Sequence, residues 1–224
     1  MSSEDVQEQP PSTPQEEQDA KTGWIWFITG PTACGKTTIA KALAKSLGFT
    51  FVEGDDYHPS ANRTKMSRNE PLTDGDRAAW LDALRADEAP QRVVTCSALK
   101  RKYRDLLRRV PPPNPPPAPP ESRSTGSSSP HGDGGLPPPE LEPMRLKVGF
   151  VLLDVPADVL RQRARDRKGH FAKEGLVESQ LRDLELPREG EGEGDVLVVK
   201  VGEGRGVENT LEEVVGRVKE KMGM

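Results

Sequence analysis

The sequence predicts an α/β protein in which helices cover both faces of a parallel β-sheet. Segments with strand character alternate with segments that have helical spacing, which is typical of βαβ units. The runs at 150–153 and 196–199 are continuously apolar, as expected for parallel strands that are buried on both faces. A glycine-rich turn separates the first strand from the first helix. We therefore expect ligands to bind at the carboxyl ends of the strands.

Apolar periodicity and the positions of glycine and proline locate each element along the chain. The expected strands are 24–29, 50–53, 92–95, 147–154 and 195–200. The expected helices are 36–47, 59–67, 74–87, 97–109, 156–168, 176–185 and 207–221. This order predicts a five-stranded sheet with helices on both sides.

Two segments differ from the rest of the chain in composition. Residues 1–22 are polar and acidic, with too few apolar side chains to offset the entropy of ordering, so we predict a disordered acidic tail. Residues 110–143 hold more than half of the 22 prolines and a Ser/Gly stretch, so we predict a disordered insert. The folded domain is then 23–224, interrupted by this insert. The insert is either a solvated loop or a ligand for an SH3- or WW-type partner.

Charge and cysteine content exclude several classes of protein. The formal net charge is −4, and because the tail is acidic the remainder is nearly neutral, which argues against nucleic-acid binding. Two cysteines cannot form a disulfide-rich scaffold or a four-thiolate metal site. No apolar run reaches the roughly 18 residues of a membrane span, and no secretory signal pattern opens the chain. We therefore expect a cytoplasmic protein that does not bind membranes.

The glycine-rich turn at 30–37 is the most specific motif in the chain. It reads Gly-Pro-Thr-Ala-Cys-Gly-Lys-Thr and matches the G-x-x-x-x-G-K-[ST] phosphate-binding loop, with a strand before it and a helix after it. Its backbone N–H groups and the helix N-terminus would face phosphate oxygens. Lys36 is expected to reach the β- and γ-phosphates, and Thr37 to hold Mg²⁺. The predicted ATP contacts are Gly30, Pro31, Thr32, Ala33, Cys34, Gly35, Lys36, Thr37 and Thr38.

Polar side chains follow the second predicted strand. Asp55 and Asp56 are adjacent carboxylates that can orient Mg²⁺-bound water or take a proton from a substrate hydroxyl, and which of them would act is open. His58, Asn62 and Lys65 stand at spacings of four and three, so one helical face would carry all three. This arrangement suits a small polyhydroxylated or acidic substrate. The alternative is a helix start with a solvated face.

Basic side chains follow the next elements. Arg77 lies in the first turn of a predicted helix, where the helix dipole disfavours a cation, so we expect it to bind an anion. Ser97 is a natural N-cap for the helix after the third strand, and Lys100 and Arg104 would share a face of that helix. The alternative is a solvated basic helix surface.

A run of arginines follows the fourth predicted strand. Arg163 and Arg167 are four residues apart, and two arginines on a mobile segment can stabilise charge on a transferring phosphoryl group. Gly169 and Gly175 could act as hinges. We therefore predict that 163–180 forms a small lid.

Taken together, these motifs resemble the gluconokinase family, the small P-loop sugar-acid kinases related to shikimate and nucleoside monophosphate kinases. The resemblance covers 24–109 and 146–220, and the succession of its motifs is specific. The motifs are the phosphate loop Gly30–Thr37, Gly54-Asp55 with His58-Pro59 and Asn62, Lys65-Met66, Pro71-Leu72-Thr73-Asp74, Asp76-Arg77 with Trp80, Cys96-Ser97-Ala98-Leu99-Lys100 with Tyr103-Arg104, Arg167-Lys168-Gly169-His170-Phe171, and Ser179-Gln180 with Leu184-Glu185 and Pro187.

The resemblance implies ATP-dependent phosphorylation of D-gluconate to 6-phospho-D-gluconate, which feeds the pentose phosphate pathway. It implies a three-layer α/β/α P-loop kinase fold with strand order 2-3-1-4-5, a small lid, and often a homodimer. It implies that Lys36, Asp55, Arg163 and Arg167 are catalytic and that Thr37 and Asp55 lie at Mg²⁺. The implied substrate contacts are Asp55, His58, Asn62, Lys65, Arg77, Lys100, Arg104 and His170.

The chain departs from the family pattern at a few places. Glu53 and Asn69 stand where the family commonly has Asp and Gly, the stretch between Trp80 and Val93 is short, and the proline-rich insert replaces a short connection. Two other functions remain open. One is a related kinase with a different small acid or a nucleotide as acceptor. The other is a nucleotide-binding interaction module that has lost catalysis and docks through the insert.

Overall fold

The computed structural model confirms the predicted fold class. It describes residues 22–68, 70, 72–86, 89–109, 145–166, 173–187, 192–202 and 206–224. Within them, five strands form one parallel sheet with the order β2-β3-β1-β4-β5, as the family resemblance implied. The strands are β1 (Thr22–Thr29), β2 (Thr50–Val52), β3 (Arg92–Thr95), β4 (Arg145–Asp154) and β5 (Val196–Lys200).

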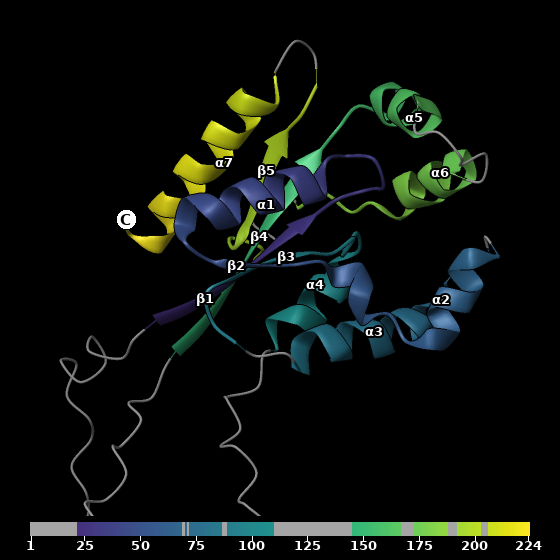
Figure 1. The fold of residues 1–224 in the computed structure, drawn as a ribbon, viewed down its shortest axis with the longest axis horizontal. Helices are drawn as coiled ribbons and strands as arrows, with labels where there is room; N and C mark the ends of the chain where they lie inside the picture. The colour runs from purple at the N-terminus through teal and green to yellow at the C-terminus, as the bar shows by residue number, and fades with distance from the viewer. Residues whose placement is uncertain are drawn as a thin grey trace, which may run out of the picture.

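The helices lie in two layers on either side of this sheet (Figure 1). α1 and α7 cover one face, and α3 and α4 cover the other. The helices are α1 (Lys36–Leu47), the 3₁₀ helix η1 (Gly54–Tyr57), α2 (Ser60–Ser67), α3 (Asp74–Ala86), α4 (Arg101–Arg108), α5 (Ala157–Asp166), α6 (Lys173–Asp183) and α7 (Val207–Met222). In the described residues, no helix has the length and apolar character needed to span a membrane.

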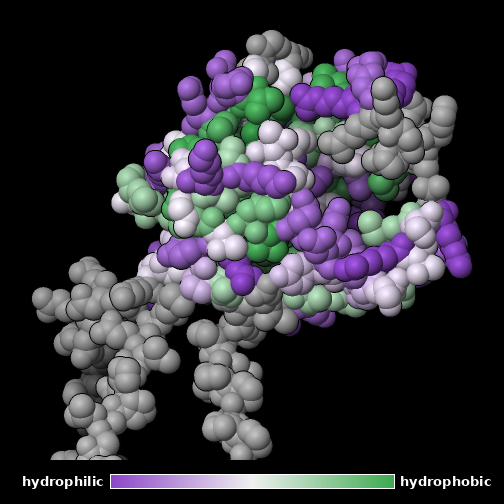
Figure 2. Space-filling model, viewed as in Figure 1, coloured by the Kyte–Doolittle hydropathy of each residue, from purple (hydrophilic) through white to green (hydrophobic). Residues whose placement is uncertain are grey.

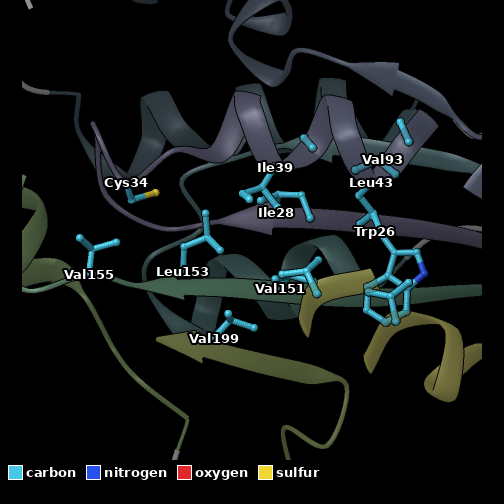
Figure 3. Close-up of a cluster of buried hydrophobic side chains, with 14 of the residues drawn as sticks. Trp26, Ile28, Cys34, Ile39, Leu43, Val93, Val151, Leu153, Val155 and Val199 are labelled. Carbon is cyan, nitrogen blue, oxygen red and sulfur yellow. The ribbon is translucent and has the colours of Figure 1, made fainter. Parts of the chain in front are cut away.

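The central strand β1 supplies side chains to both hydrophobic cores. Because side chains alternate along a strand, Trp26 and Ile28 pack toward α1 and α7, whereas Ile25 and Phe27 pack toward α3 and α4. Figure 3 shows the first of these cores between the sheet and α1. Each large side chain buried in this way contributes about 1.5–3 kcal/mol. Hydrophobic burial therefore fixes β1 in the middle of the sheet, directly beneath the phosphate loop.

The ring of Trp26 fills the space above Gly149. The two residues are register partners on β1 and β4, and a Cβ on Gly149 would lie 2.5 Å from the Trp26 ring. Trp24 stacks on Trp26 with ring centroids 5.3 Å apart. The glycine in β4 is thus required by the size of the indole on the neighbouring strand.

Most expected elements agree with the structure to within a few residues, with three differences. β1 already begins at Thr22, which we had placed in the tail. α6 begins at Lys173, earlier than predicted. α4 begins at Arg101, so Ser97 is not its N-cap, because the chain from Ser97 to Lys100 is irregular and Ala98 has a φ of 33°.

Several predictions fall on residues that the structure does not describe. They are the acidic tail apart from Thr22, the proline-rich insert, and the tip of the predicted lid with Arg167 and His170. These remain predictions. The described parts of the lid segment are helical and belong to α5 and α6.

Candidate active site

The candidate site lies at the carboxyl ends of the central strands, where the arrows of β1 and β4 point toward α2, α5 and α6 (Figure 1). The phosphate loop leaves β1, and the segment Cys96–Lys100, here called the acceptor loop, leaves β3. Their first residues are joined by two backbone hydrogen bonds. Cys96 N–H donates to Ile28 O at 3.1 Å, and Gly30 N–H donates to Ser97 O at 3.2 Å. Parallel strand pairing thus places the two loops side by side.

The phosphate loop has the geometry that its sequence predicts. Gly30 and Gly35 have φ values of 137° and 104°, which side-chain-bearing residues rarely adopt. α1 begins directly after Gly35 with no side chain capping it, so its first N–H groups remain available to phosphate oxygens. Lys36 Nζ lies along the loop and donates to Gly30 O at 3.0 Å and Pro31 O at 2.9 Å. Phosphate oxygens would compete with these carbonyl groups for the ammonium.

Glu53, which the sequence analysis did not select, is the carboxylate that meets Thr37. Thr37 Oγ1 donates to Glu53 Oε2 at 3.1 Å, and Thr95 Oγ1 donates to Glu53 Oε1. Glu53 directly follows β2, which pairs with β3, and its side chain reaches Thr37 of α1 and Thr95 of β3. Its place immediately after β2 was the available signal. The structure thus brings Glu53 to Thr37, the residue expected at Mg²⁺.

Asp55 points away from Glu53 and toward His58. Its side chain is 70% exposed, and its Oδ1 lies 3.9 Å from His58 Nε2. Gly54, between the two carboxylates, packs so tightly that an added Cβ would lie 1.9 Å from Thr95 O. The glycine lets the backbone pass Thr95, and the chain direction there sends Glu53 toward the phosphate loop and Asp55 toward the acceptor side.

His58 is buried and is held by two neighbours. Its ring stacks on Trp80 with centroids 4.2 Å apart, and its Nδ1 lies 3.4 Å from Asn62 Nδ2. Because an amide nitrogen only donates, Nδ1 must accept, and the ring proton lies on Nε2, which faces Asp55. Burial lowers the pKa of His58, an effect that Arg77 reinforces and Asp55 opposes. His58 is thus a neutral ring that presents an N–H donor.

Asn62 and Lys65 are engaged within the protein. Asn62 is 3% exposed, and its Nδ2 donates to Asp76 O at 2.8 Å. Lys65 Nζ lies 2.8 Å from both carboxylate oxygens of Asp76, and Asp76 Oδ2 also accepts from the N–H and the hydroxyl of Thr73. These hydrogen bonds, that of Lys65 foremost, lower the pKa of Asp76 to about 2. In the structure Asn62 supports His58 and Lys65 joins α2 to α3, and their contact with substrate stays a prediction.

Arg77 is a cation for which the described residues supply no ion-pair partner. Its guanidinium carbon lies 5.9 Å from the ring centroid of Tyr103, and it forms no ion pair with a described carboxylate. Its charge acts on both His58 and Cys96. An arginine held against a ring beside the acceptor loop can bind an anion there.

The prediction that Arg104 contacts substrate is wrong, because its guanidinium is fully buried and fully used. It donates to both carboxylate oxygens of Glu193 at 2.8 and 2.7 Å. It also donates to Ala98 O at 3.3 Å, Leu99 O at 3.1 Å and Glu185 O at 3.1 Å. The hydrogen bond from Arg104 is the main reason that the pKa of Glu193 is lowered to about 2. Arg104 thus holds the acceptor loop from behind.

Lys100 and Arg163 reach the site from opposite sides. Lys100 Nζ lies 3.0 Å from Asp183 Oδ1, at the end of α6. Arg163 Nη1 lies 3.4 Å from Cys34 O in the phosphate loop. Lys100 precedes α4, so it does not share a helical face with Arg104 as predicted.

The buried thiol of Cys96 shows that charges from three segments converge. Burial raises the pKa of Cys96 to about 12, and the charges of Asp55, Lys36 and Arg77 all act on it. Cys96 is the first residue after β3 and opens the acceptor loop. Lys36, Asp55 and Arg77 are therefore all near enough for their charges to act on its thiol.

Comparisons with known proteins show which proteins this chain is similar to. The model of the shikimate kinase family matches residues 32–110. A "Probable gluconokinase" from Schizosaccharomyces pombe is 37% identical over 190 residues, which cover 81% of this chain and 82% of that protein. The "Thermoresistant gluconokinase" of Escherichia coli is 34% identical over 183 residues, which cover 79% of this chain and 84% of that protein.

This chain belongs to the gluconokinase family. The crystal structure of a gluconokinase from Sinorhizobium meliloti supports the assignment, with a TM-score of 0.64 and 33% identity over 90% of this chain and 97% of that one. A shikimate kinase from Bacteroides thetaiotaomicron shares the fold alone, with a TM-score of 0.52 and 18% identity.

Two of the departures from the gluconokinase family pattern, the short stretch after Trp80 and Glu53, fall on described residues. The short stretch after Trp80 still forms α3 to Ala86, and β3 begins at Arg92. Glu53, where the family commonly has Asp, reaches Thr37. The longer side chain therefore still lies beside the expected metal ligand.

Proposed function

We propose that this chain transfers the γ-phosphoryl group of ATP to D-gluconate, giving 6-phospho-D-gluconate and ADP. The phosphate loop with Lys36 lies directly beside the acceptor loop, joined to it by two backbone hydrogen bonds, and this juxtaposition carries the proposal. A phosphate-binding cation, a proton acceptor and an anion-binding cation are what a sugar-acid kinase needs at one place. The curated relatives named gluconokinase favour gluconate among acids of this size. In this function the product would enter the pentose phosphate pathway.

On the nucleotide side, the loop N–H groups and Lys36 bind and neutralise the phosphates of ATP. Mg²⁺ fits this side, because Thr37 Oγ1 and the carboxylate of Glu53 lie together. In the described residues, no group of three or more His, Cys, Asp or Glu side chains could hold a metal ion. The Mg²⁺ proposed here would bind mainly to phosphates and water. When bound, Mg²⁺ would offset negative charge on the phosphates.

On the acceptor side, Arg77 would bind the carboxylate of gluconate. Asp55 is favoured over Asp56 as the group that accepts the proton of the attacking hydroxyl, because Asp55 faces His58 and acts on Cys96. The Nε2–H of His58 can donate to that hydroxyl or to Asp55. Lys100 would supply a second positive charge.

The remaining predictions extend this proposal. Arg163 would act on the phosphates from above the loop, and Arg167 and His170 would close with the lid. Cytoplasmic location, a homodimer and an SH3- or WW-type partner for the insert remain predictions of the sequence.

The proposal is tested by measuring ADP release with Mg-ATP and each of gluconate, glucose, shikimate, AMP or no acceptor. We expect turnover with gluconate that Lys36→Ala abolishes. Shikimate belongs in the panel because the shikimate kinase model matches part of the chain. Turnover with another acceptor alone would replace gluconate. ATP binding without turnover would favour a binding module.

A further inference from the structure

One helix, α6, contacts both loops of the candidate site. At the phosphate loop, Gln180 Oε1 accepts the backbone N–H of Thr32 at 2.5 Å. Thr32 is the third residue of that loop, and its N–H is among the donors expected to face ATP. α6 is itself tied to α5, because Arg161 Nε donates to Glu178 Oε1 at 2.6 Å. Gln180, which has no role in the proposed function, thus attaches the phosphate loop to α6.

The carboxyl end of the same helix is attached to the acceptor loop. Asp183 Oδ1 lies 3.0 Å from Lys100 Nζ. Two residues later, Glu185 N–H donates to Leu99 O at 2.9 Å, and its carboxylate accepts the N–H of Arg101 at 2.7 Å. The Glu185 carboxylate therefore caps the start of α4, which has no cap of its own. Figure 1 shows α6 beside the phosphate loop, on the side toward which the strands point.

The two loops are otherwise joined mainly at their bases, by the backbone pairs that continue the sheet. Beyond those pairs, α6 spans the loops from Thr32 to Lys100. Phosphoryl transfer depends on the distance and angle between the groups that the two loops hold, and a misplacement of about 1 Å can cost roughly a hundredfold in rate. The structure thus contains an element in position to fix that distance.

We propose that α6 sets the position of the phosphate loop relative to the acceptor loop, with Gln180 and Asp183 as its positioning residues. The proposal rests on the proposed function for its kinetic consequences. Gln180 fixes the orientation of the Thr32 peptide, and Asp183 fixes the ammonium of Lys100. Neither residue needs to touch a substrate for this role.

The test compares Gln180→Met, Asp183→Asn and their double variant with wild type. Methionine keeps the length of glutamine but removes the acceptor, and Arg182→Gln, at an exposed position on the same helix, is the matched control. We expect Gln180→Met to lower kcat about ten- to a hundredfold, with smaller changes in both KM values. We expect the double variant to lose little more than the worse single variant, because both residues serve one arrangement.

Three kinetic outcomes would overturn the proposal. Additive losses in the double variant would mean that the two residues act independently. A lower KM for ATP at unchanged kcat in Gln180→Met would mean that Gln180 competes with phosphate for the Thr32 N–H. Unchanged kinetics in Gln180→Met would also contradict it.

Amide hydrogen exchange separates this proposal from the identity of the acceptor. Loss of the Gln180 acceptor should speed exchange at Thr32 about fivefold, the effect of one net hydrogen bond. If α6 joins the loops, exchange at Arg101 should rise as well. If the Arg101 amide does not respond, α6 does not join the loops, whether or not gluconate is the substrate. If exchange responds but gluconate is not phosphorylated, only the proposed function fails.

Discussion

The nucleotide side and the acceptor side of the candidate site are built in different ways. The nucleotide side is built mainly on one continuous segment, 30–38, whose binding groups are backbone N–H donors and two adjacent side chains. The acceptor side gathers side chains from η1, α2, α3 and the acceptor loop. Most of these are held by other side chains, as Asn62 holds His58 and Asp76 holds Lys65.

The nucleotide side thus consists mainly of groups that bind the phosphates themselves, whereas the acceptor side also contains many groups that only hold those binding groups in position. On the nucleotide side, a substitution removes a binding group directly. On the acceptor side, many polar residues act one step away, so that a substitution displaces a neighbour. Figure 2 shows hydrophilic residues over the α2 and α5–α6 regions. Arg104 is fully buried, so a view of the surface does not reveal it. Exposure alone therefore does not distinguish groups that perform chemistry from groups that position them. A buried side chain whose donors all have partners within the protein, such as Arg104, is a positioning group.

The largest expected effect comes from breaking the buried support of the acceptor loop. Arg104→Met leaves the carboxylate of Glu193 buried with only Arg108 as a partner, so we expect the free energy of unfolding to fall by about 3–5 kcal/mol. Urea unfolding measures this. Arg101→Met, on a half-exposed side chain of the same helix, should change stability by at most about 0.5 kcal/mol. A stable Arg104→Met with only a raised KM for gluconate would restore Arg104 as a substrate contact.

The sequence predicted the two sides with different success for a physical reason. Residues 30–37 are contiguous, so their spacing alone determines a geometry that the structure reproduces. The partners of Arg104 are not local, since Glu193 is far along the chain and the start of α4 depends on the backbone at Ala98. Spacing cannot reveal such pairing. Glu53 was missed because its role depends on β2 lying beside β3.

On the nucleotide side, Lys36→Ala removes the cation expected to stabilise charge on the transferring group. We expect kcat to fall about 10²–10³-fold. Folding should be unaffected, because Lys36 Nζ bonds only to carbonyls of its own loop. Steady-state kinetics and thermal unfolding check the two expectations. A large loss of stability would show that the lysine also holds the loop together.

Arg77 offers the matching experiment on the acceptor side. Arg77→Ala removes a charged hydrogen-bond donor worth about 1.5–3 kcal/mol, so kcat/KM for gluconate should fall roughly ten- to a hundredfold. The KM for ATP should hardly change. Arg68→Ala, an exposed arginine after α2, is the control and should leave both constants unchanged. An equal effect on the KM for ATP would place Arg77 at the phosphates instead.

The smallest expected effect is a shift in the pKa of His58, which tests whether its neighbours set its protonation state. Its pKa is lowered, so the neutral ring contributes stability that is complete above pH 6.5 and is lost as the pH falls below that value. NMR titration should show a midpoint below 6.5 and an Nε2–H tautomer above it.

Asn62→Asp places a carboxylate beside Nδ1 of His58 in place of an N–H donor. The carboxylate favours a proton on Nδ1 and stabilises the imidazolium, so the midpoint should rise by about 1. The acidic limb of kcat/KM for gluconate should move upward with it, because the charged ring attracts Asp55 and makes it a weaker proton acceptor. If the midpoint rises while the kinetic limb stays in place, His58 supports the fold of the acceptor side but does not act on the reacting hydroxyl.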